Sequence, residues 1–201
     1  FQAEDGIRDC LLSRGLGDVY KRQSQDKVLV ATPSEGLDRG AIAMSAQVNL
    51  GDVAEPEMIQ RMARVTTESH EKSIPVLGMF YPRGDNLNLD DSDSTSGVAH
   101  AARLAWELGC NVVKVPWTGS EESFETVTSS VPIPVLVSGG PKDDDFGKVL
   151  ELVEKSINAG GSGVCMGRNV FSSEDPASRI RALRAIVHDE ASAEEASRHL
   201  R

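Results

Sequence analysis

The sequence places one lysine, Lys114, inside a run of apolar β-branched residues, NVVKV at 111–115. Such a run is typical of a strand buried on both faces, where an unpaired ammonium costs free energy. Desolvation favours the neutral amine, which attacks carbonyl carbons, so Lys114 is a candidate for forming a Schiff base with a ketone. The alternatives are a lysine at the strand end that reaches solvent, or one that pairs with a carboxylate.

Tyr81 begins a second segment whose side chains could take part in catalysis, YPRG at 81–84. A phenol beside an ammonium or iminium group can donate or accept a proton while a carbon–carbon bond forms or breaks. Pro82 fixes the backbone after the tyrosine, and Arg83 offers a contact for an anion. The alternative is a tyrosine that only packs, with its hydroxyl satisfied by a neighbour.

Two glycine-containing segments follow the last two predicted strands. The segment SGGPK at 138–142 puts Gly139 and Gly140 at a strand end, where unhindered backbone amides can approach an anion. One βα unit later Gly167 does the same, and Arg168 adds a forked guanidinium donor. Together the two loops predict a phosphate site, although a GG pair alone is often only a tight turn.

Cysteine and histidine spacing predicts no metal site. The three cysteines, Cys10, Cys110 and Cys165, show neither CxxC pairing nor metal-ligand spacing, so we expect buried or free thiols. The four histidines all lie in polar helical contexts, where exposed or capping roles are usual. They are His70, His100, His188 and His199.

The elements that must position these groups follow from hydrophobic periodicity. Apolar runs predict five strands, and periods near 3.6 predict helices between and after them. The strands are expected at 41–48, 75–80, 111–115, 134–138 and 163–166, with an earlier apolar run at 27–31 and a polar turn or helix at 34–40. The helices are expected at 52–72, from after Gly97 to a stop at Gly109, and at 121–129, 146–159 and 176–188.

This alternation indicates parallel βα units, as in a doubly wound sheet or a (β/α)8 barrel. The unusual residues decide between the two folds, because they lie at or just beyond the carboxyl ends of successive strands. Catalytic groups at that end, with phosphate-binding loops on the last two strands, are typical of the barrel. The predicted fold is therefore α/β, of the TIM-barrel type.

Composition narrows the classes of function. The chain has 201 residues and 39% hydrophobic residues, enough for one domain with a real core. A net charge of -10 argues against non-specific binding to nucleic acid or to an anionic membrane surface. No apolar run approaches the roughly 20 residues needed to span a bilayer, and no signal segment begins the chain. We expect a cytoplasmic location.

The first residues do not behave like the rest. The segment 1–23 follows neither a strand nor a helix period for long, and its end, GDVYKRQ, is similar to translated sequencing-adapter DNA. We therefore expect 1–23 to be a non-native artefact and 24–201 to be part of the barrel. The alternative is an ordinary N-terminal helix.

From about residue 41 onward, the chain resembles the archaeal-type class I aldolases, a DhnA-like family of Schiff-base-forming (β/α)8 barrels. The resemblance is carried by ordered motifs: YPRG at 81–84, HAARLAWELGCNVVK ending at Lys114, WTG at 117–119, SGGPK at 138–142 and GVCMGRNVF at 163–171. It implies Lys114 as the Schiff-base lysine and Tyr81 as the proton donor. It also implies that Tyr81, Pro82 and Arg83 line the substrate site and that Gly139, Gly140, Gly167 and Arg168 hold a sugar phosphate.

The resemblance implies aldol transfer on a phosphorylated ketose, with no metal or organic cofactor because the iminium is the electron sink. Met79 precedes the tyrosine by two positions, where fructose-bisphosphate aldolases of the family resemble WxYPRG. This favours a 2-amino-3,7-dideoxy-D-threo-hept-6-ulosonate synthase, of early aromatic amino acid biosynthesis, with L-aspartate semialdehyde as the second substrate. The alternatives are a class I fructose-bisphosphate aldolase and, from another class, a non-catalytic phosphate-binding fragment. The family's ring-like multimers imply a homo-oligomer.

One departure from the family pattern concerns the start of the chain. Family members begin with strands that include an Asp-His-Gly-like motif with a general-base aspartate, and none of these precedes Lys27. We expect the chain to correspond to about strands 4 to 8 of the barrel. Without the other strands, we expect residues 1–201 alone to be aggregation-prone and to lack turnover.

Overall fold

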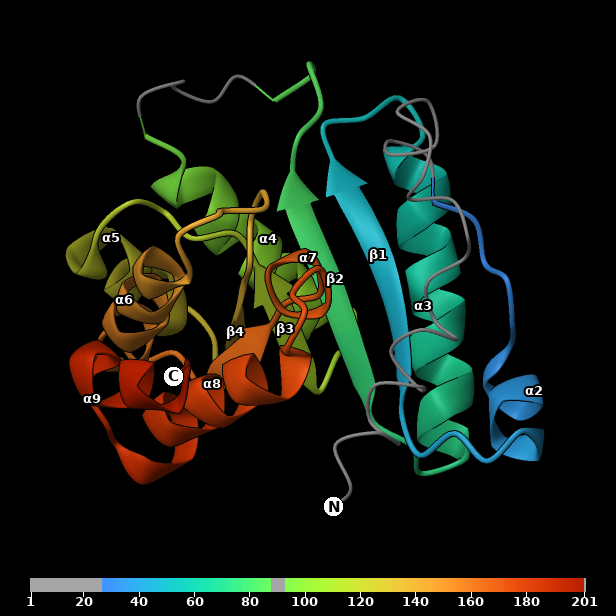
Figure 1. The fold of residues 1–201 in the computed structure, drawn as a ribbon. Helices are drawn as coiled ribbons and strands as arrows, with labels where there is room; N and C mark the ends of the chain where they lie inside the picture. Colours follow the sequence, from blue (N-terminus) through green and yellow to red (C-terminus); the bar gives the residue numbers. More distant parts are fainter. Residues whose placement is uncertain (1–26, 88–92, 201) are drawn as a thin grey trace.

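The computed structural model describes residues 27–87 and 93–200, and its centre is a five-stranded parallel sheet. The strands lie in the sheet in the same order as in the chain (Figure 1). They are β1 (Met44–Leu50), β2 (Val76–Pro82), β3 (Val112–Val115), β4 (Val135–Ser138) and β5 (Gly163–Cys165). All five predicted strands are confirmed. β1 runs later than expected, because its first backbone contact to the sheet is made by Met44, which donates to Pro75.

One helix precedes the first strand, and at least one helix follows each strand. The helices are α2 (Pro33–Asp38), α3 (Glu55–Glu71), α4 (Thr95–Glu107), α5 (Glu121–Thr128), α6 (Phe146–Asn158), α7 (Arg168–Phe171), α8 (Pro176–Asp189) and α9 (Ala193–Ser197), before a 3-10 turn at Arg198–Leu200. The segment 34–40, expected as a turn or helix, contains most of α2. Within the ranges the structure describes, no helix is long and apolar enough to cross a bilayer.

The start of α4 corrects one expectation. Gly97 was expected to end the preceding loop, yet it is buried within α4, two residues after the helix begins. The Asp93 side chain accepts a hydrogen bond of 2.8 Å from the Thr95 backbone amide, which satisfies one of the donors at the helix start. A side chain of a neighbouring residue therefore outweighs the low helix propensity of glycine here.

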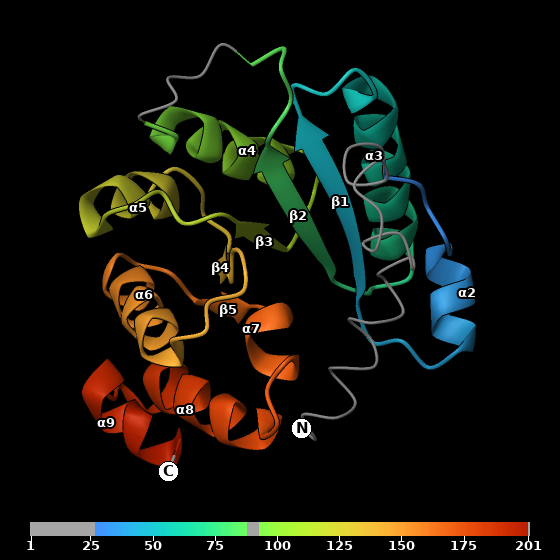
Figure 2. The same cartoon turned by 45° about the horizontal axis from the view of Figure 1, so that its top comes forward.

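The connections between strands distinguish a barrel-type sheet from a doubly wound one. Each strand pairs in parallel with the next strand in the chain, so the order never reverses. Helices α3 to α6 and α8 form an arc around one side of the curved sheet (Figure 2). A doubly wound sheet would place helices on both faces and reverse its strand order.

The face of the sheet that meets the helices holds the larger apolar core. Strand side chains at alternate positions, such as Phe80, Val113 and Val115, are fully buried there. They pack against Met62 of α3 and Phe124 of α5, among others. Alternation along a strand then sends the intervening side chains to the other face.

The opposite face of the sheet, which we call the inner face, carries the candidate catalytic residues. Val113 and Val115 face the helices, so Lys114 between them belongs to the inner face. Its register partner on β2 is Met79, and Tyr81 lies on the same face two residues further along that strand. The polar side chains at 45, 47 and 49 of β1 also belong to the inner face by alternation.

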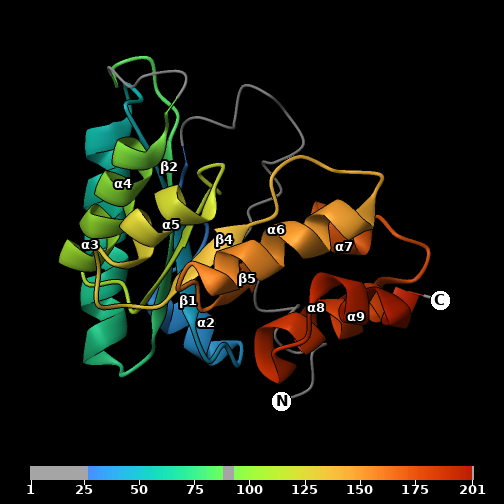
Figure 3. The ribbon, with the colours of Figure 1, turned by 90° about the vertical axis from the view of Figure 1, so that its left-hand side faces the viewer.

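A second, smaller core lies beside β5 at the end of the chain. Helices α6, α8 and α9 pack together there (Figure 3). Their contact is apolar and includes Leu150, Val153, Leu183, Ile186 and Ala196. The sequence did not indicate α9, whose five residues are too few for a helical period, although its capping Ser192 and Glu195 carry a recognisable motif.

The two cysteines in the described residues are free thiols, as expected. Cys110 is buried, and its sulfur lies 3.8 Å from that of Met62. This burial raises the pKa of the Cys110 thiol to about 12. Cys165 is only partly buried, and Cys10 lies outside the described residues.

We expect Cys110 to resist alkylation by iodoacetamide at pH 8 while the protein is folded, because the thiolate is the reactive form and burial disfavours it. Peptide mass spectrometry should find Cys110 modified only after denaturant is added. Modification of Cys110 in the native protein as fast as in the denatured protein would contradict this packing. The pKa shift also makes stability fall as pH rises above about 9, because the thiol then ionises only in the unfolded chain.

Candidate active site

The residues singled out from the sequence meet at one edge of the sheet. Tyr81, Lys114 and Ser138 lie near the carboxyl ends of three adjacent strands, β2, β3 and β4. The loops after β4 and β5 follow directly at the same edge. Parallel strands place their carboxyl ends together, so this arrangement follows from the topology.

Lys114 is the charged residue of the inner face, and it is 5% exposed. Its register partners are Met79 on β2 and Leu136 on β4, so apolar neighbours flank it on both sides. Within residues 27–87 and 93–200, its amine has neither a hydrogen-bond partner nor a carboxylate at ion-pair distance. The alternative prediction, that Lys114 pairs with a carboxylate, is therefore not supported by the described residues.

Tyr81 and Arg83 form a stacked pair. The guanidinium carbon of Arg83 lies 3.9 Å from the centroid of the Tyr81 ring. Tyr81 is buried, whereas Arg83 is exposed, so the cation covers the ring at the rim of the inner face. Pro82, between them, is the last residue of β2 and lies in register with Leu50.

The loop after β2 is held against the loop after β1. The amides of Arg83 and Gly84 both donate to the Leu50 carbonyl, at 3.1 and 2.8 Å. A Cβ atom on Gly84 would lie 1.7 Å from the Gly51 carbonyl carbon, so the two backbones touch. This contact fixes the backbone immediately after Tyr81 and explains the glycine that ends YPRG.

The two glycines after β4 have different roles. A Cβ on Gly139 would lie 2.5 Å from the Cβ of Met166, so a side chain is excluded by the neighbouring loop. Gly140 has a φ of 61°, and no atom lies within 4 Å of its hypothetical Cβ. Glycine is therefore favoured at position 140 by the positive φ angle, and the space beside the loop is open.

The loops after β4 and β5 are joined by side chains of the second loop. Arg168, which is exposed, donates from Nη2 to the Gly140 carbonyl at 3.1 Å. Asn169, which is 1% exposed, donates from Nδ2 to the carbonyls of Gly139 and Pro141, at 2.5 and 3.0 Å. Gly167 caps the one-turn helix α7 that carries both side chains. The structure thus brings together all four residues predicted for the phosphate site.

Sequence reasoning missed several inner-face groups. Gln47 donates from Nε2 to Oδ1 of Asn49 at 2.9 Å, and Asn49 is 1% exposed. Gln47 lies in register with Met79 and Asn49 with Tyr81, so both amides adjoin β2, the strand that carries Tyr81. The alternation of polar residues in SAQVNL at 45–50 was the available signal.

Other residues considered in the sequence lie outside the candidate site. Trp117 packs on Phe124, with ring centroids 5.0 Å apart. The four histidines are exposed. Across the described residues, no group of His, Cys, Asp or Glu could hold a metal ion.

Comparison with known sequences gives the family. A model of the DeoC/LacD family aldolases matches residues 14–173. The match begins inside the segment 1–23, whose foreign origin stays a prediction because 1–26 lie outside the described residues. The chain is also 38% identical over 171 residues to a 2-amino-4,5-dihydroxy-6-oxo-7-(phosphonooxy)heptanoate synthase of Streptomyces griseus, covering 85% of this chain and 62% of that protein.

A second curated relative is the 2-amino-3,7-dideoxy-D-threo-hept-6-ulosonate synthase 1 of Archaeoglobus fulgidus. It is 39% identical over 163 residues, which cover 81% of this chain and 59% of the relative. The chain thus spans about 60% of the length of these curated relatives.

Solved structures agree on the fold. An archaeal fructose 1,6-bisphosphate aldolase superposes with a TM-score of 0.75 at 31% identity, over 81% of this chain and 64% of that one. The Schiff-base-forming fructose-1,6-bisphosphate aldolase gives the same TM-score and identity, over 80% and 64%. The five parallel strands therefore correspond to part of a TIM-barrel aldolase. Since the family model covers most of its residues, the chain belongs to the DeoC/LacD family of aldolases.

Proposed function

We propose that this chain supplies the Schiff-base lysine, the proton-transfer tyrosine and the phosphate loops of an enzyme that performs aldol transfer on a phosphorylated ketose. The observation that carries the proposal is Lys114, a buried lysine between apolar register neighbours near the carboxyl end of β3. A related solved structure has its catalytic lysine covalently bound to the carbinolamine intermediate of its substrate, which supports the same role here.

In this mechanism, the Lys114 amine attacks the ketone carbon, and loss of water gives a protonated imine. The imine withdraws electrons from the adjacent carbon–carbon bond, which breaks as the β-hydroxyl proton leaves. After the first aldehyde fragment leaves, the resulting enamine attacks the carbonyl carbon of the acceptor aldehyde, whose oxygen takes up a proton. Water then hydrolyses the product imine, which releases the ketone product and the Lys114 amine. Tyr81, on the neighbouring strand and the same face, is placed to move these protons.

The phosphate is held by the loops after β4 and β5. Arg168 offers charge-assisted donors beyond the one it gives to Gly140, and the amides of the glycine loop offer further ones. Arg83 lies at the rim above Tyr81 and contributes a second cation to the site.

The names of the two curated relatives support L-aspartate semialdehyde as the acceptor. Each product carries an amino group at C2, a hydroxyl at C4 and a ketone at C6. A β-hydroxy ketone of this form is made by an aldol bond between C4 and C5, so C1 to C4 come from aspartate semialdehyde in both. The products differ at C7, which is a methyl group in one and carries a phosphonooxy group in the other.

The leading activity is therefore the 2-amino-3,7-dideoxy-D-threo-hept-6-ulosonate synthase reaction, which belongs to early aromatic amino acid biosynthesis. Met79 supports it, since its register partner is Lys114 and its thioether leaves more room than an indole beside the reacting carbon. Fructose 1,6-bisphosphate cleavage is the second candidate, favoured by the solved relatives. The homo-oligomer and the cytoplasmic location remain proposals with this activity.

The first test traps the imine. Borohydride added to the intact gene product with its phosphorylated ketose should reduce the imine and add the sugar's mass to the peptide that contains Lys114. Lys114→Met should abolish both the label and turnover without lowering the melting temperature, because it replaces a buried side chain that has no described polar partner with an apolar one of similar length.

Lys142 provides the internal control for trapping. It lies beside the phosphate loop, but its side chain is 52% exposed and pairs with Asp144 at 3.3 Å. Label found on Lys142, or label that survives Lys114→Met, would contradict the assignment of Lys114.

The second test separates phosphate binding from imine chemistry. Arg168→Ala should weaken binding of phosphorylated substrates by about tenfold to a hundredfold, because a charge-assisted hydrogen bond contributes about 1.5 to 3 kcal/mol. An analogue without phosphate should react almost unchanged. Arg184→Ala, which removes an exposed arginine paired with Asp189 on α8, is the matched control and should affect neither substrate. Equal losses for both substrates in Arg168→Ala would refute the phosphate role.

The third test decides between the two activities. Product formation is measured with L-aspartate semialdehyde as acceptor and, separately, as cleavage of fructose 1,6-bisphosphate. We expect transfer to exceed cleavage, and Met79→Trp to reduce transfer because the indole overfills the space beside Lys114. Faster cleavage than transfer in the unchanged protein would assign it to the fructose-bisphosphate aldolases.

A further inference from the structure

We infer that Asn169 is the positioning residue of the phosphate site, and that it turns the amides of Gly140 and Lys142 toward the bound phosphate. The inference rests on the proposed function, because it assumes that the loops after β4 and β5 receive a phosphate. The inference goes further by giving a role to Asn169, whose side chain is buried beneath these loops.

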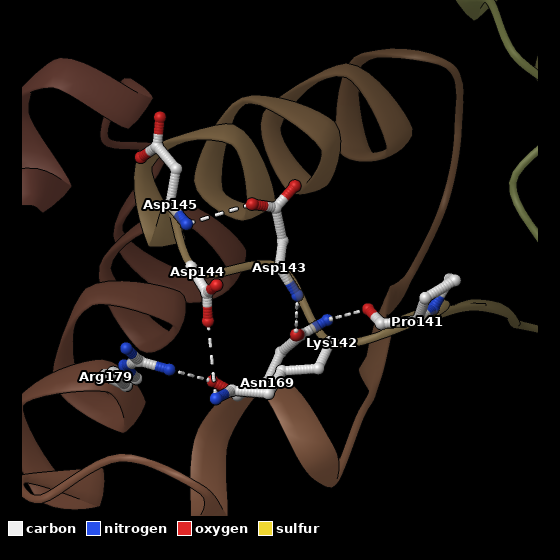
Figure 4. Close-up of polar contacts among 7 residues, drawn as sticks. All are labelled: Pro141, Lys142, Asp143, Asp144, Asp145, Asn169 and Arg179. Carbon is white, nitrogen blue, oxygen red and sulfur yellow. Dashed lines mark hydrogen bonds and ion pairs between the residues drawn. The ribbon is translucent and has the colours of Figure 1, made fainter.

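All three hydrogen bonds of the Asn169 side chain go to one loop, and Figure 4 shows the two to Pro141 and Asp143. Nδ2 donates to the carbonyls of Gly139 and Pro141, at 2.5 and 3.0 Å, and Oδ1 accepts from the Asp143 amide at 2.9 Å. One side chain thus fixes the path of the backbone from 139 to 143. Two donors and one acceptor at these positions are what a carboxamide supplies and a carboxylate or hydroxyl does not.

The orientation of the loop amides follows from these contacts. In a trans peptide, the carbonyl and the following N–H point in opposite directions, and the described residues contain no cis peptide. Since the carbonyls of Gly139 and Pro141 face Asn169, the N–H groups of Gly140 and Lys142 face away from it. Neither amide donates a hydrogen bond to a residue within 27–87 or 93–200. Two aligned donors are therefore presented on the open side of the loop.

The other end of Asn169 is anchored to the helix layer. Nη1 of Arg179, on α8, donates to the Asn169 backbone carbonyl at 2.5 Å (Figure 4). The same guanidinium lies 4.5 Å from the ring centroid of Phe146, the first residue of α6. Asn169 thus connects an exposed loop to two helices of the second core, which explains how a loop rich in glycine can hold one geometry.

The test compares substrates with and without phosphate in the intact gene product. Asn169→Asp keeps the acceptor for Asp143 but loses both donors, and Asn169→Ala loses all three contacts without adding charge. Both should raise KM for the phosphorylated ketose and the inhibition constant of inorganic phosphate by at least about tenfold, because misplaced donors bind poorly. The kcat/KM of the analogue without phosphate should stay within about twofold.

Asn111→Ala is the matched control. Oδ1 of Asn111 accepts a hydrogen bond of 2.9 Å from the Val76 amide at the amino-terminal edge of the sheet. The substitution therefore removes a side-chain hydrogen bond to the backbone at the edge opposite to the proposed phosphate site. It should leave KM for the phosphorylated ketose unchanged. A lower kcat for both substrates with unchanged KM in the Asn169 variants, or the failure of both variants to fold, would assign Asn169 to fold stability and overturn the inference.

Arg168→Ala separates the two possible failures. If it discriminates between the substrates while the Asn169 variants do not, only the positioning role is wrong. If neither Arg168→Ala nor the Asn169 variants discriminate, the phosphate site itself is wrong and the proposed function fails with it.

Discussion

The site depends on the alternation of side chains along β3. Val113 and Val115 contribute to the apolar layer between sheet and helices, and this fixes Lys114 on the opposite face. Slipping the strand by one residue would bury the ammonium among helix side chains and expose two valines, a change that the core opposes strongly. The packing of two ordinary valines therefore orients Lys114, the amine that we propose forms the imine.

The same constraint explains what the sequence could predict. The strands are continuous apolar runs and the helices show a hydrophobic period near 3.6, so the sheet could be predicted. Lys114, Tyr81 and Arg168 could be identified as candidates because polar and charged residues are unusual at or near the ends of such strands. The start of α4 was misplaced because Asp93, a loop residue, supports a helix that includes Gly97. Local patterns cannot weigh such a contact against the low propensity of glycine.

Contacts between distant segments were beyond prediction from a single sequence. The contacts of Asn169 were not predicted, because its partners lie 26 to 30 residues away on another loop. The two glycines of SGGPK looked equivalent, yet one is required by Met166 and the other by its own backbone angle. Gln47 fell inside the predicted strand 41–48 and Asn49 just beyond it. Their alternation could indicate a shared face, but the local sequence could not show that they lie in register with Met79 and Tyr81.

The phosphate loops and Lys114 are connected chiefly through the sheet. Lys114 lies in register with Leu136, and Leu136 with Gly163, so a row of backbone hydrogen-bonded strands separates the amine from both loops. Under the proposed function, a substrate anchored by its phosphate reaches across a fixed number of strands to bring its ketone to the amine. Chain length between phosphate and ketone becomes a selection rule set by strand spacing, which is nearly constant in sheets. Side chains such as Met79, which border the amine from the other side, are then left to distinguish what is attached to the reacting carbon.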